Sequence, residues 1–387
     1  MTEKVAPIPV ARPTLGEEEA AAARRAILSG WVVQGPEVEA FEKEFAALTG
    51  APLAVACSSG TAALHLALLA LDLKAGDEVI TVSSSFIATA NAVRYVGATP
   101  VFVDVELATG NLDPGLIEDA VTHRTRAILA VHQLGMPCDL GRILEIAQKH
   151  NLAVVEDAAC ATGSEIILDN GLWEPIGRPR GLLATFSFHP RKVLTTGDGG
   201  MVTGRDPEIM ARLARLRTHA MSLSTAERHG AAKVMFEQYP EVGYNYRLSD
   251  IQGAVGREQL KRLPGLVAAR RRLAARYREG LSANPYLTLP QEPGFARSNW
   301  QSFWIILTND SPLSQMELMQ ALLGRGIHTR RGVMCAHREP AYRDLPLRRP
   351  LPVSEFLLDH GIILPLYPEL PEGDQDRVIA ALNEILT

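Results

Sequence analysis

The sequence has few cysteines and no long apolar run, and each absence excludes a class of protein. Four cysteines occur in 387 residues, at Cys57, Cys138, Cys160 and Cys335, with no C-x-x-C spacing. This pattern predicts reduced thiols, no structural metal site and a cytoplasmic location. The first 20 residues lack an apolar segment, and no run of about 18 apolar residues follows. We therefore expect neither a secretory signal nor a membrane span.

An excess of charge of either sign is also missing. The net charge is −5 and the pI is near 6.1, so no general attraction to nucleic acid or to anionic membranes is expected. The one basic run, AARRRLAARYREG at residues 268–280, is interpreted as the solvent-exposed side of an amphipathic helix whose buried side carries Leu273 and Tyr277. The alternative, a nucleic-acid-binding face, lacks stacking aromatic residues and neighbouring basic elements.

The region from about residue 50 to 205 alternates apolar runs with segments of helical period. The strand-like runs are Ala54–Cys57, Val79–Val82, Val101–Asp104, Ala127–His132, Ala153–Glu156 and Thr185–Phe188. The helical segments are Thr61–Leu73, Ala88–Val96, Pro114–Val121 and Leu140–His150. This alternation predicts an α/β fold, with a mainly parallel sheet between layers of helices. Ligands of such sheets bind beyond the carboxyl ends of the strands.

The later part of the chain predicts a second, smaller unit. A long Arg-rich helical segment covers Ser249–Leu281, followed by strand-like runs at Ser302–Leu307 and Gly361–Leu364 and helical patterns at Ser314–Leu323 and Asp374–Leu386. We interpret residues 1–255 as an N-terminal arm with a large ligand-binding domain. Residues 256–387 are then a small C-terminal α+β domain.

An anion-binding turn is predicted in VACSSGTAALHLALLAL, where a strand ends and a helix begins. Free backbone N–H groups and the positive end of the helix dipole attract anions there. Gly60 permits close approach of the backbone, and Ser59 or Thr61 adds a hydroxyl donor. Serine and threonine are also ordinary helix caps, so this feature alone is ambiguous. No Walker motif is present and no G-x-G-x-x-G follows a strand, which argues against ATP and dinucleotide sites.

Two further features accompany this turn. Asp157 ends an apolar strand in LAVVEDAACATGS, where a carboxylate needs a partner; a helix cap or a structural ion pair is the alternative. Lys192 follows a strand in TFSFHPRKVLTTGDGGMV and precedes a glycine-rich turn, although an isolated lysine is more often a surface residue. A phosphate anchor, a carboxylate for a pyridinium nitrogen and a lysine that forms an imine are the protein parts of a pyridoxal phosphate (PLP) site.

The chain resembles the DegT/DnrJ/EryC1/StrS family of PLP-dependent sugar aminotransferases (class VI) along nearly its whole length. The resemblance is carried by SGWVVQGPEVEAFEKEF (29–45), SSGTAALHLALLAL (58–71), GDEVITVSSSFIATANAVRYVGATPVFVDV (76–105), VHQLGMPCDL (131–140), VEDAACATGS (155–164), FSFHPRKVLTTGDGGMV (186–202) and GYNYRLSDIQGAVGREQL (243–260). It implies a fold-type I transferase and a homodimer that builds each active site from two subunits.

The resemblance also implies roles for single residues. Lys192 matches the family's imine lysine and Asp157 its pyridinium partner. The phosphate turn corresponds to Ser59, Gly60 and Thr61, with a hydroxyl added by Ser187. Phe86 matches the aromatic residue that stacks on the cofactor ring, and core packing is its alternative.

Three further positions near the cofactor are expectations of the same kind. Asn245 matches the residue that reaches the phosphate in the neighbouring subunit. Cys160 stands where many relatives have Gln or His facing the ring hydroxyl, so that contact is either lost or replaced by water. His189 is expected to position substrate or water, or else to satisfy local backbone. Residues 165–182, with Trp173, Arg178 and Arg180, either border the substrate pocket or form a plain surface hairpin.

The activity that the resemblance implies is transamination, with PLP cycling through pyridoxamine phosphate. L-Glutamate is the expected amino donor, and a nucleotide-linked 4-keto-6-deoxy sugar is the expected keto acceptor. A keto-cyclitol of the scyllo-inosose type, a 3-keto sugar, or a broader range of amines and ketones are the alternatives. Candidate substrate-binding residues are Trp31, His189, Arg228, His229, Arg330, Arg331 and His337, of which the arginine pair before Gly332 is favoured for a diphosphate.

Other function classes remain as alternatives. Family members that dehydrate sugars carry histidine in place of the lysine, so Lys192 favours transamination. A cofactor-bound regulator would be expected to carry a fused DNA-binding module. A PLP lyase or decarboxylase of the same fold would not transfer an amino group to a ketone, and a purely structural protein would show no cofactor absorbance.

Overall fold

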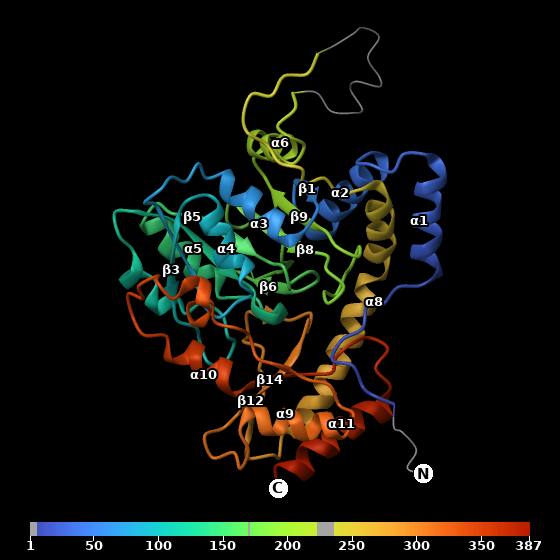
Figure 1. The fold of residues 1–387 in the computed structure, drawn as a ribbon, viewed down its shortest axis with the longest axis vertical. Coiled ribbons are helices and arrows are strands. Elements are labelled where there is room, and N and C mark those ends of the chain that lie inside the picture. Colours follow the sequence, from blue (N-terminus) through green and yellow to red (C-terminus); the bar gives the residue numbers. More distant parts are fainter. Residues whose placement is uncertain (1–5, 169–170, 223–235) are drawn as a thin grey trace.

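The structure, a computed structural model, describes residues 6–168, 171–222 and 236–387. The first part of the chain builds two helices and a seven-stranded sheet with its covering helices (Figure 1). The helices are α1 (Glu17–Ser29), α2 (Pro36–Thr49), α3 (Gly60–Leu69), α4 (Ala88–Tyr95), α5 (Leu140–Lys149) and α6 (Pro207–Leu216). The strands of this sheet are β1 (Leu53–Cys57), β2 (Glu78–Val82), β3 (Thr99–Val103), β4 (Thr125–Val131), β5 (Ala153–Asp157), β8 (Leu183–Ser187) and β9 (Gly200–Gly204).

The strand order of the large sheet is β1-β9-β8-β5-β4-β2-β3. Within the described residues, only β9 runs against the other strands, since it pairs antiparallel with both β1 and β8 while the remaining neighbours pair in parallel. The predicted mainly parallel α/β fold is therefore confirmed. Its carboxyl edge brings together the ends of β1, β5 and β8 and the start of β9.

Alternate residues of the strands face two separate apolar layers. Val79, Ala127 and Val155 pack with α3, α4 and α6 on one face. Ile80 and Ile128 pack with α2, α5 and the first half of α8 (Asp250–Leu281) on the other. A strand buried on both faces reads as a continuous apolar run, which is why the sequence signal was strong.

A smaller antiparallel sheet lies at the other end of the molecule, in the order β10-β12-β14-β13. Its strands are β10 (Leu287–Thr288), β12 (Phe303–Leu307), β13 (Arg330–Arg331) and β14 (Gly361–Leu364), and its helices are α9 (Gln315–Gly324), α10 (Pro352–His360) and α11 (Glu372–Ile385). The apolar core beneath this sheet includes the second half of α8, α9 and α11.

Helix α8 joins the two parts, and the expected boundary at residue 255 lies inside it. Leu260, Leu263 and Val267 belong to the core of the large sheet, whereas Leu273 and Tyr277 belong to that of the small sheet. Ile8, ahead of α1, pairs with Ile327 in the core of the small sheet, and the chain then continues to α1 beside α8 (Figure 1).

Two local details differ from or extend the predicted elements. The helical segment expected at Pro114–Val121 forms two short 3-10 turns, Pro114–Leu116 and Glu118–Ala120, rather than an α-helix. Strands β6 (Glu165–Ile167), β7 (Trp173–Pro175) and β11 (Ala296–Arg297) form a third sheet that the sequence did not reveal. No helix in the described ranges has the length and apolar character needed to cross a membrane.

Candidate active site

The predicted phosphate turn lies at the carboxyl edge of the large sheet. Ser59 caps α3 by accepting a hydrogen bond from the Ala62 N–H at 3.1 Å. A Cβ atom on Gly60 would lie 2.6 Å from the Cβ of Ser187, at the end of β8. Gly60 therefore allows the start of α3 to approach Ser187, and the expected hydroxyl donor stands beside the expected turn. Thr61 follows as the second residue of α3.

The predicted carboxylate, Asp157, is the last residue of β5 and is 4% exposed. Its Oδ2 accepts a hydrogen bond from Thr89 Oγ1 at 2.8 Å, and its Oδ1 accepts one from the Ala159 N–H at 3.2 Å. Thr89 Oγ1 is in turn 2.8 Å from Ser85 Oγ. These contacts fix the orientation of the carboxylate. The sequence did not identify Thr89, because nothing in its position along α4 indicates contact with β5.

Glu156, the neighbour of Asp157, is held by different groups. Its Oε2 accepts a hydrogen bond from His132 Nε2 at 3.2 Å, and its Oε1 accepts the backbone N–H groups of Arg180 and Gly181, both at 3.2 Å. His132 Nδ1 accepts the Cys138 N–H, which leaves the proton on Nε2. Glu156 is thus a structural group with buried partners, and the two adjacent carboxylates have separate surroundings.

Lys192 lies next to Cys160, with 3.0 Å between Nζ and Sγ. Both side chains are partly exposed, whereas Cys57, Cys138 and Cys335 are buried. The backbone N–H of Lys192 donates to the carbonyl of His189 at 2.8 Å. The turn after β8 therefore brings the predicted lysine to the loop that follows Asp157. A carboxylate at a strand end, a lysine on the next loop and a glycine-lined helix start are the donor set that PLP requires.

Phe86 and Asn245 are both at the surface of the single chain. Phe86 is 63% exposed, and its carbonyl accepts the N–H of Thr89, the residue that holds Asp157. Core packing, the alternative for Phe86, is thereby excluded. Asn245 is exposed and precedes Tyr246, whose carbonyl accepts the Ser58 N–H at 2.8 Å. Both residues therefore adjoin the strand ends that carry the predicted site.

Of the predicted substrate residues, His189 and Arg330 lie near Lys192. The pKa of His189 is lowered by burial and by the positive charges of Arg191, Lys192 and Arg330. The pKa of Arg330 is lowered by burial and by Arg191 and Arg331, and the thiol of Cys160 opposes that shift. The positive charges of Arg191, Lys192 and Arg330 thus lie close enough to His189 to lower its pKa.

The remaining predicted substrate residues have other partners or positions. Arg331 pairs with Glu339 at 3.5 Å. His337 Nδ1 lies 2.6 Å from Ser83 Oγ and its Nε2 lies 3.0 Å from Glu355 Oε1, so both ring nitrogens are engaged. Trp31 Nε1 donates to the carbonyl of Gln34 at 3.1 Å, near the start of α2. Arg228 and His229 lie outside the described residues.

The described strands of segment 165–182 agree with its hairpin interpretation, and a border with the substrate pocket stays a prediction. Strands β6 and β7 pair antiparallel, and β6 also pairs with β11. Arg178 and Arg180 both pair with Glu174, and the guanidinium of Arg297 lies 3.8 Å from the centre of the Trp173 ring. These side chains thus have partners within the hairpin and its neighbour.

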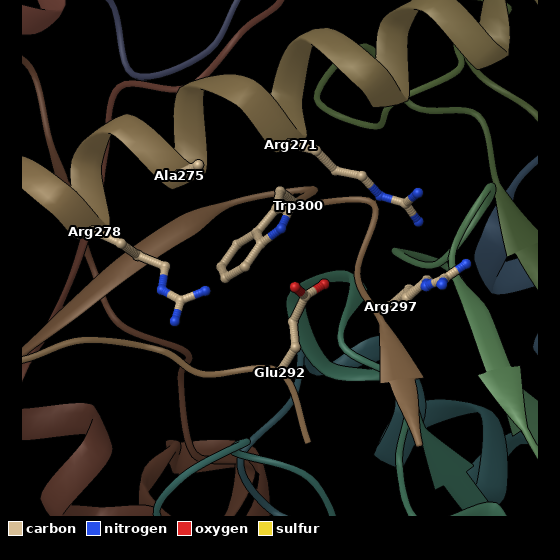
Figure 2. Close-up of a pocket in the computed structure, with 6 residues that line it drawn as sticks. All are labelled: Arg271, Ala275, Arg278, Glu292, Arg297 and Trp300. Carbon is tan, nitrogen blue, oxygen red and sulfur yellow. The ribbon is translucent and has the colours of Figure 1, made fainter. Parts of the chain in front are cut away.

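A pocket of about 250 Å³ lies beneath α8 and is formed by other residues: Arg271, Ala275, Arg278, Glu292, Arg297 and Trp300. Figure 2 shows the Trp300 indole below the helix, with Arg278 and Glu292 reaching toward it. Arg271 pairs with Glu165 at 3.1 Å, and Glu292 accepts the Ser298 N–H at 2.6 Å. Since the predicted site residues do not line this pocket, it is separate from the Lys192 cluster.

Comparison with known proteins gives consistent matches along the whole chain. The profile of the DegT/DnrJ/EryC1/StrS aminotransferase family matches residues 13–383. Among solved structures, DesV of S. venezuelae, in complex with a ketimine intermediate, is 36% identical, with 99% of each chain covered and a TM-score of 0.89. DesI, solved in the presence of its TDP-sugar product, is 31% identical, with 99% of this chain and 94% of that chain covered and a TM-score of 0.88. A putative sugar aminotransferase of Streptococcus pneumoniae, solved in its PLP-form, is 26% identical, with 98% and 100% covered and a TM-score of 0.89.

Proposed function

The chain belongs to the DegT/DnrJ/EryC1/StrS aminotransferase family and is a PLP-dependent aminotransferase. From this premise we propose that it transfers the amino group of L-glutamate to a nucleotide-linked 4-keto-6-deoxy sugar. The observation that carries the proposal is the convergence of Lys192, Asp157 and the Gly60–Ser187 approach at one edge of the large sheet. DesI and its TDP-sugar product support the class of acceptor.

The cofactor supplies a ring that accepts electrons from the substrate carbon and carries the amino group between the two half-reactions, as PLP and then as pyridoxamine phosphate. The donors at the strand ends fit this group. Backbone N–H groups at the start of α3, with the hydroxyls of Ser59, Thr61 and Ser187, would hold its phosphate. The carboxylate of Asp157, oriented by Thr89, would hold the ring nitrogen in its protonated form.

Lys192 is the proposed proton-transferring group. Its amine would take the proton from the α-carbon of the donor and deliver it to the bound cofactor, and the acceptor half-reaction would run these transfers in reverse. Phe86 would lie against one face of the ring, and Cys160 would face the ring hydroxyl. The exposed Asn245 would reach the phosphate of the cofactor in a second subunit, so the proposed active unit is a homodimer.

The cations around Lys192 are proposed to bind the acidic parts of the substrates. Arg330 is the member of the arginine pair whose charge lowers the pKa of His189. The thiol of Cys160 in turn raises the pKa of Arg330. A guanidinium binds phosphate and carboxylate oxygens through paired N–H groups. We therefore propose that Arg330 binds the nucleotide diphosphate and that His189 orients the substrate or a water molecule.

An absorbance titration tests the proposed function. Purified protein is titrated with PLP and then with L-glutamate, beside a Lys192→Ala variant. We expect a cofactor band that depends on Lys192 and is converted by glutamate to the pyridoxamine form. A band that glutamate and other amino acids leave unchanged would contradict transamination and favour a lyase or a binding protein.

The acceptor is then identified by which ketone restores the original band. A matched panel contains a TDP-linked 4-keto-6-deoxy sugar, a 3-keto nucleotide sugar, a scyllo-inosose and a simple ketone. We expect the first compound to react with the highest kcat/KM. Faster reaction of the cyclitol or of the simple ketone would overturn the nucleotide-sugar assignment and leave transamination intact.

A further inference from the structure

The segment from Ser298 to Gln301 has an unusual backbone in the middle of the protein. Trp300 has a φ of 51°, in the left-handed region that bulky residues rarely adopt. It is 4% exposed, and its indole lines the pocket below α8 (Figure 2). The polar residues on either side, Asn299 and Gln301, are 0% and 8% exposed. A strained backbone that carries two buried amides persists only where the surrounding contacts fix it.

Both amide side chains donate to main-chain carbonyls of the proposed active site. Asn299 Nδ2 donates to the carbonyl of Cys160 at 2.8 Å and to that of Thr162 at 2.9 Å. Gln301 Nε2 donates to the carbonyl of Arg191, the residue that precedes Lys192. The two amides thus hold the backbone on both sides of the Lys192–Cys160 contact.

The segment is itself anchored from α8. Arg270 is 3% exposed, and its Nη1 donates to the carbonyls of Trp300, Gln301 and Leu366 at 3.2–3.3 Å. Burial lowers the pKa of Arg270 to about 10, so the side chain remains charged at neutral pH. Asn299 Oδ1 also accepts the backbone N–H of Gln301 at 2.8 Å, which ties the Asn299 side chain to the main chain of Gln301.

One of the two polar atoms of the Gln301 side-chain amide forms a hydrogen bond, and the other does not within the described residues. Its Nε2 faces a carbonyl, which fixes the orientation of the group, whereas its buried Oε1 has no hydrogen-bond partner among the residues that the structure describes. A buried polar atom without a partner destabilises the fold, so an apolar side chain would serve core packing better. The value of glutamine at this position therefore lies in the bond that it donates to Arg191.

We propose that Gln301 and Asn299 are positioning residues for the reaction: through the carbonyls of Arg191 and Cys160 they set where the Lys192 amine stands. The proposal rests on the proposed function, since it takes Lys192 as the proton-transferring group. Misplacement of such a group slows proton transfer without a matching loss of substrate binding.

The chain offers a matched control in Gln375. This residue is 0% exposed, its Nε2 donates to the carbonyl of Leu273 at 2.7 Å, and its Oε1 likewise has no partner in the described part of the chain. It lies on α11 in the core of the small sheet. Gln301→Leu and Gln375→Leu thus remove the same chemical groups from two buried positions, and they differ in whether the lost bond leads to Lys192.

The experiment compares the two variants with the wild-type protein, all loaded with PLP. For Gln301→Leu we expect kcat to fall about 10- to 100-fold while KM for glutamate changes less than about twofold. We also expect the pH titration of the cofactor absorbance to shift. Gln375→Leu should lose comparable thermal stability and keep the wild-type kcat and titration. Equal kinetics and equal titrations in the two variants would overturn the positioning role.

A third variant, Gln301→Glu, retains the size of the side chain and its acceptor oxygen but loses the donor. We expect it to be as slow as Gln301→Leu at pH 8, and wild-type activity would overturn the proposal. A wild-type protein without a Lys192-dependent absorbance band would instead overturn the proposed function, and the positioning role with it. The two failures are therefore distinguishable.

Discussion

The carboxyl edge of the large sheet and the loops of the small domain both carry predicted site residues, but in different ways. At the sheet edge, Asp157 and Ser187 are the last residues of β5 and β8, and Gly60 begins the helix that follows β1, so the order of the strands brings them together. Near the small sheet, Arg331 pairs with Glu339 and His337 contacts Glu355 of α10. Of these three predicted residues, Arg330 is the one whose charge lowers the pKa of His189, next to Lys192 along the loop. At the sheet edge, the order of the strands therefore determines which residues are neighbours. Near the small sheet, local packing determines it.

The largest expected effect is at the sheet edge itself. Lys192→Ala should lower kcat by at least about 10³-fold, because the group that moves the proton is removed. The measurement is single-turnover conversion of bound PLP by L-glutamate. Far-ultraviolet circular dichroism and the melting temperature serve as controls for folding. Activity within tenfold of wild type would contradict the assigned role of Lys192.

The adjacent carboxylates of β5 provide a paired test of the same edge. Asp157→Asn should reduce kcat/KM by about 10²- to 10³-fold, because a neutral amide does not stabilise a protonated ring nitrogen. Glu156→Gln should keep kcat/KM and lower the free energy of unfolding by about 1–3 kcal/mol, because its new N–H groups would face the His132 Nε2–H. Steady-state kinetics and urea denaturation measure both quantities. Loss of kcat/KM in Glu156→Gln and loss of stability in Asp157→Asn would show that Glu156 serves the reaction and Asp157 the fold.

A smaller effect is expected for the arginines of β13. Arg330→Met should raise KM for the keto acceptor about tenfold, because a charge-assisted hydrogen bond to the substrate is lost. Arg331→Met, which breaks the exposed pair with Glu339, should change KM less than about twofold. Equal KM values for the keto acceptor in the two variants would contradict the distinction drawn here between Arg330 and Arg331.

The smallest expected effect concerns pH. Burial lowers the folded-state pKa of His65 below its ordinary value of 6.5, and burial and nearby cations lower that of His189. At these two sites the unfolded chain therefore binds more protons, and their contribution to stability should fall as the pH drops below about 6.5, whereas the raised pKa of His132 acts in the opposite direction. Between pH 7.5 and 5.5 we expect the melting temperature of the wild-type protein to fall relative to that of His65→Asn. If His65→Asn showed the same pH dependence of the melting temperature as the wild-type protein, His65 would make no contribution to it.

The sequence was sufficient for the large sheet and for the motifs at its strand ends, because buried strands and glycine turns leave strong local patterns. Those motifs resembled a family, and the structure and the comparisons confirmed the family and the fold. Asn299, Gln301 and Thr89 were not predicted. Asn299 and Gln301 donate hydrogen bonds to main-chain carbonyls. Because every residue type has a main-chain carbonyl, the residues that accept these bonds show no pattern in the sequence. Strands β6, β7 and β11 were missed because two or three residues are too few for a period.

The first residues of the chain have a consequence for how the protein is assembled. Ile8 is 1% exposed and belongs to the core of the small sheet, where its backbone bonds to Gly326 and His328, and the carbonyl of Val10 accepts the Leu366 N–H. The C-terminal unit is thus completed by a piece from the opposite end of the polypeptide. A fragment of residues 256–387 would lack that piece and expose the apolar site it fills. During synthesis, this segment can make these contacts only after Gly326, His328 and Leu366 have been added to the chain.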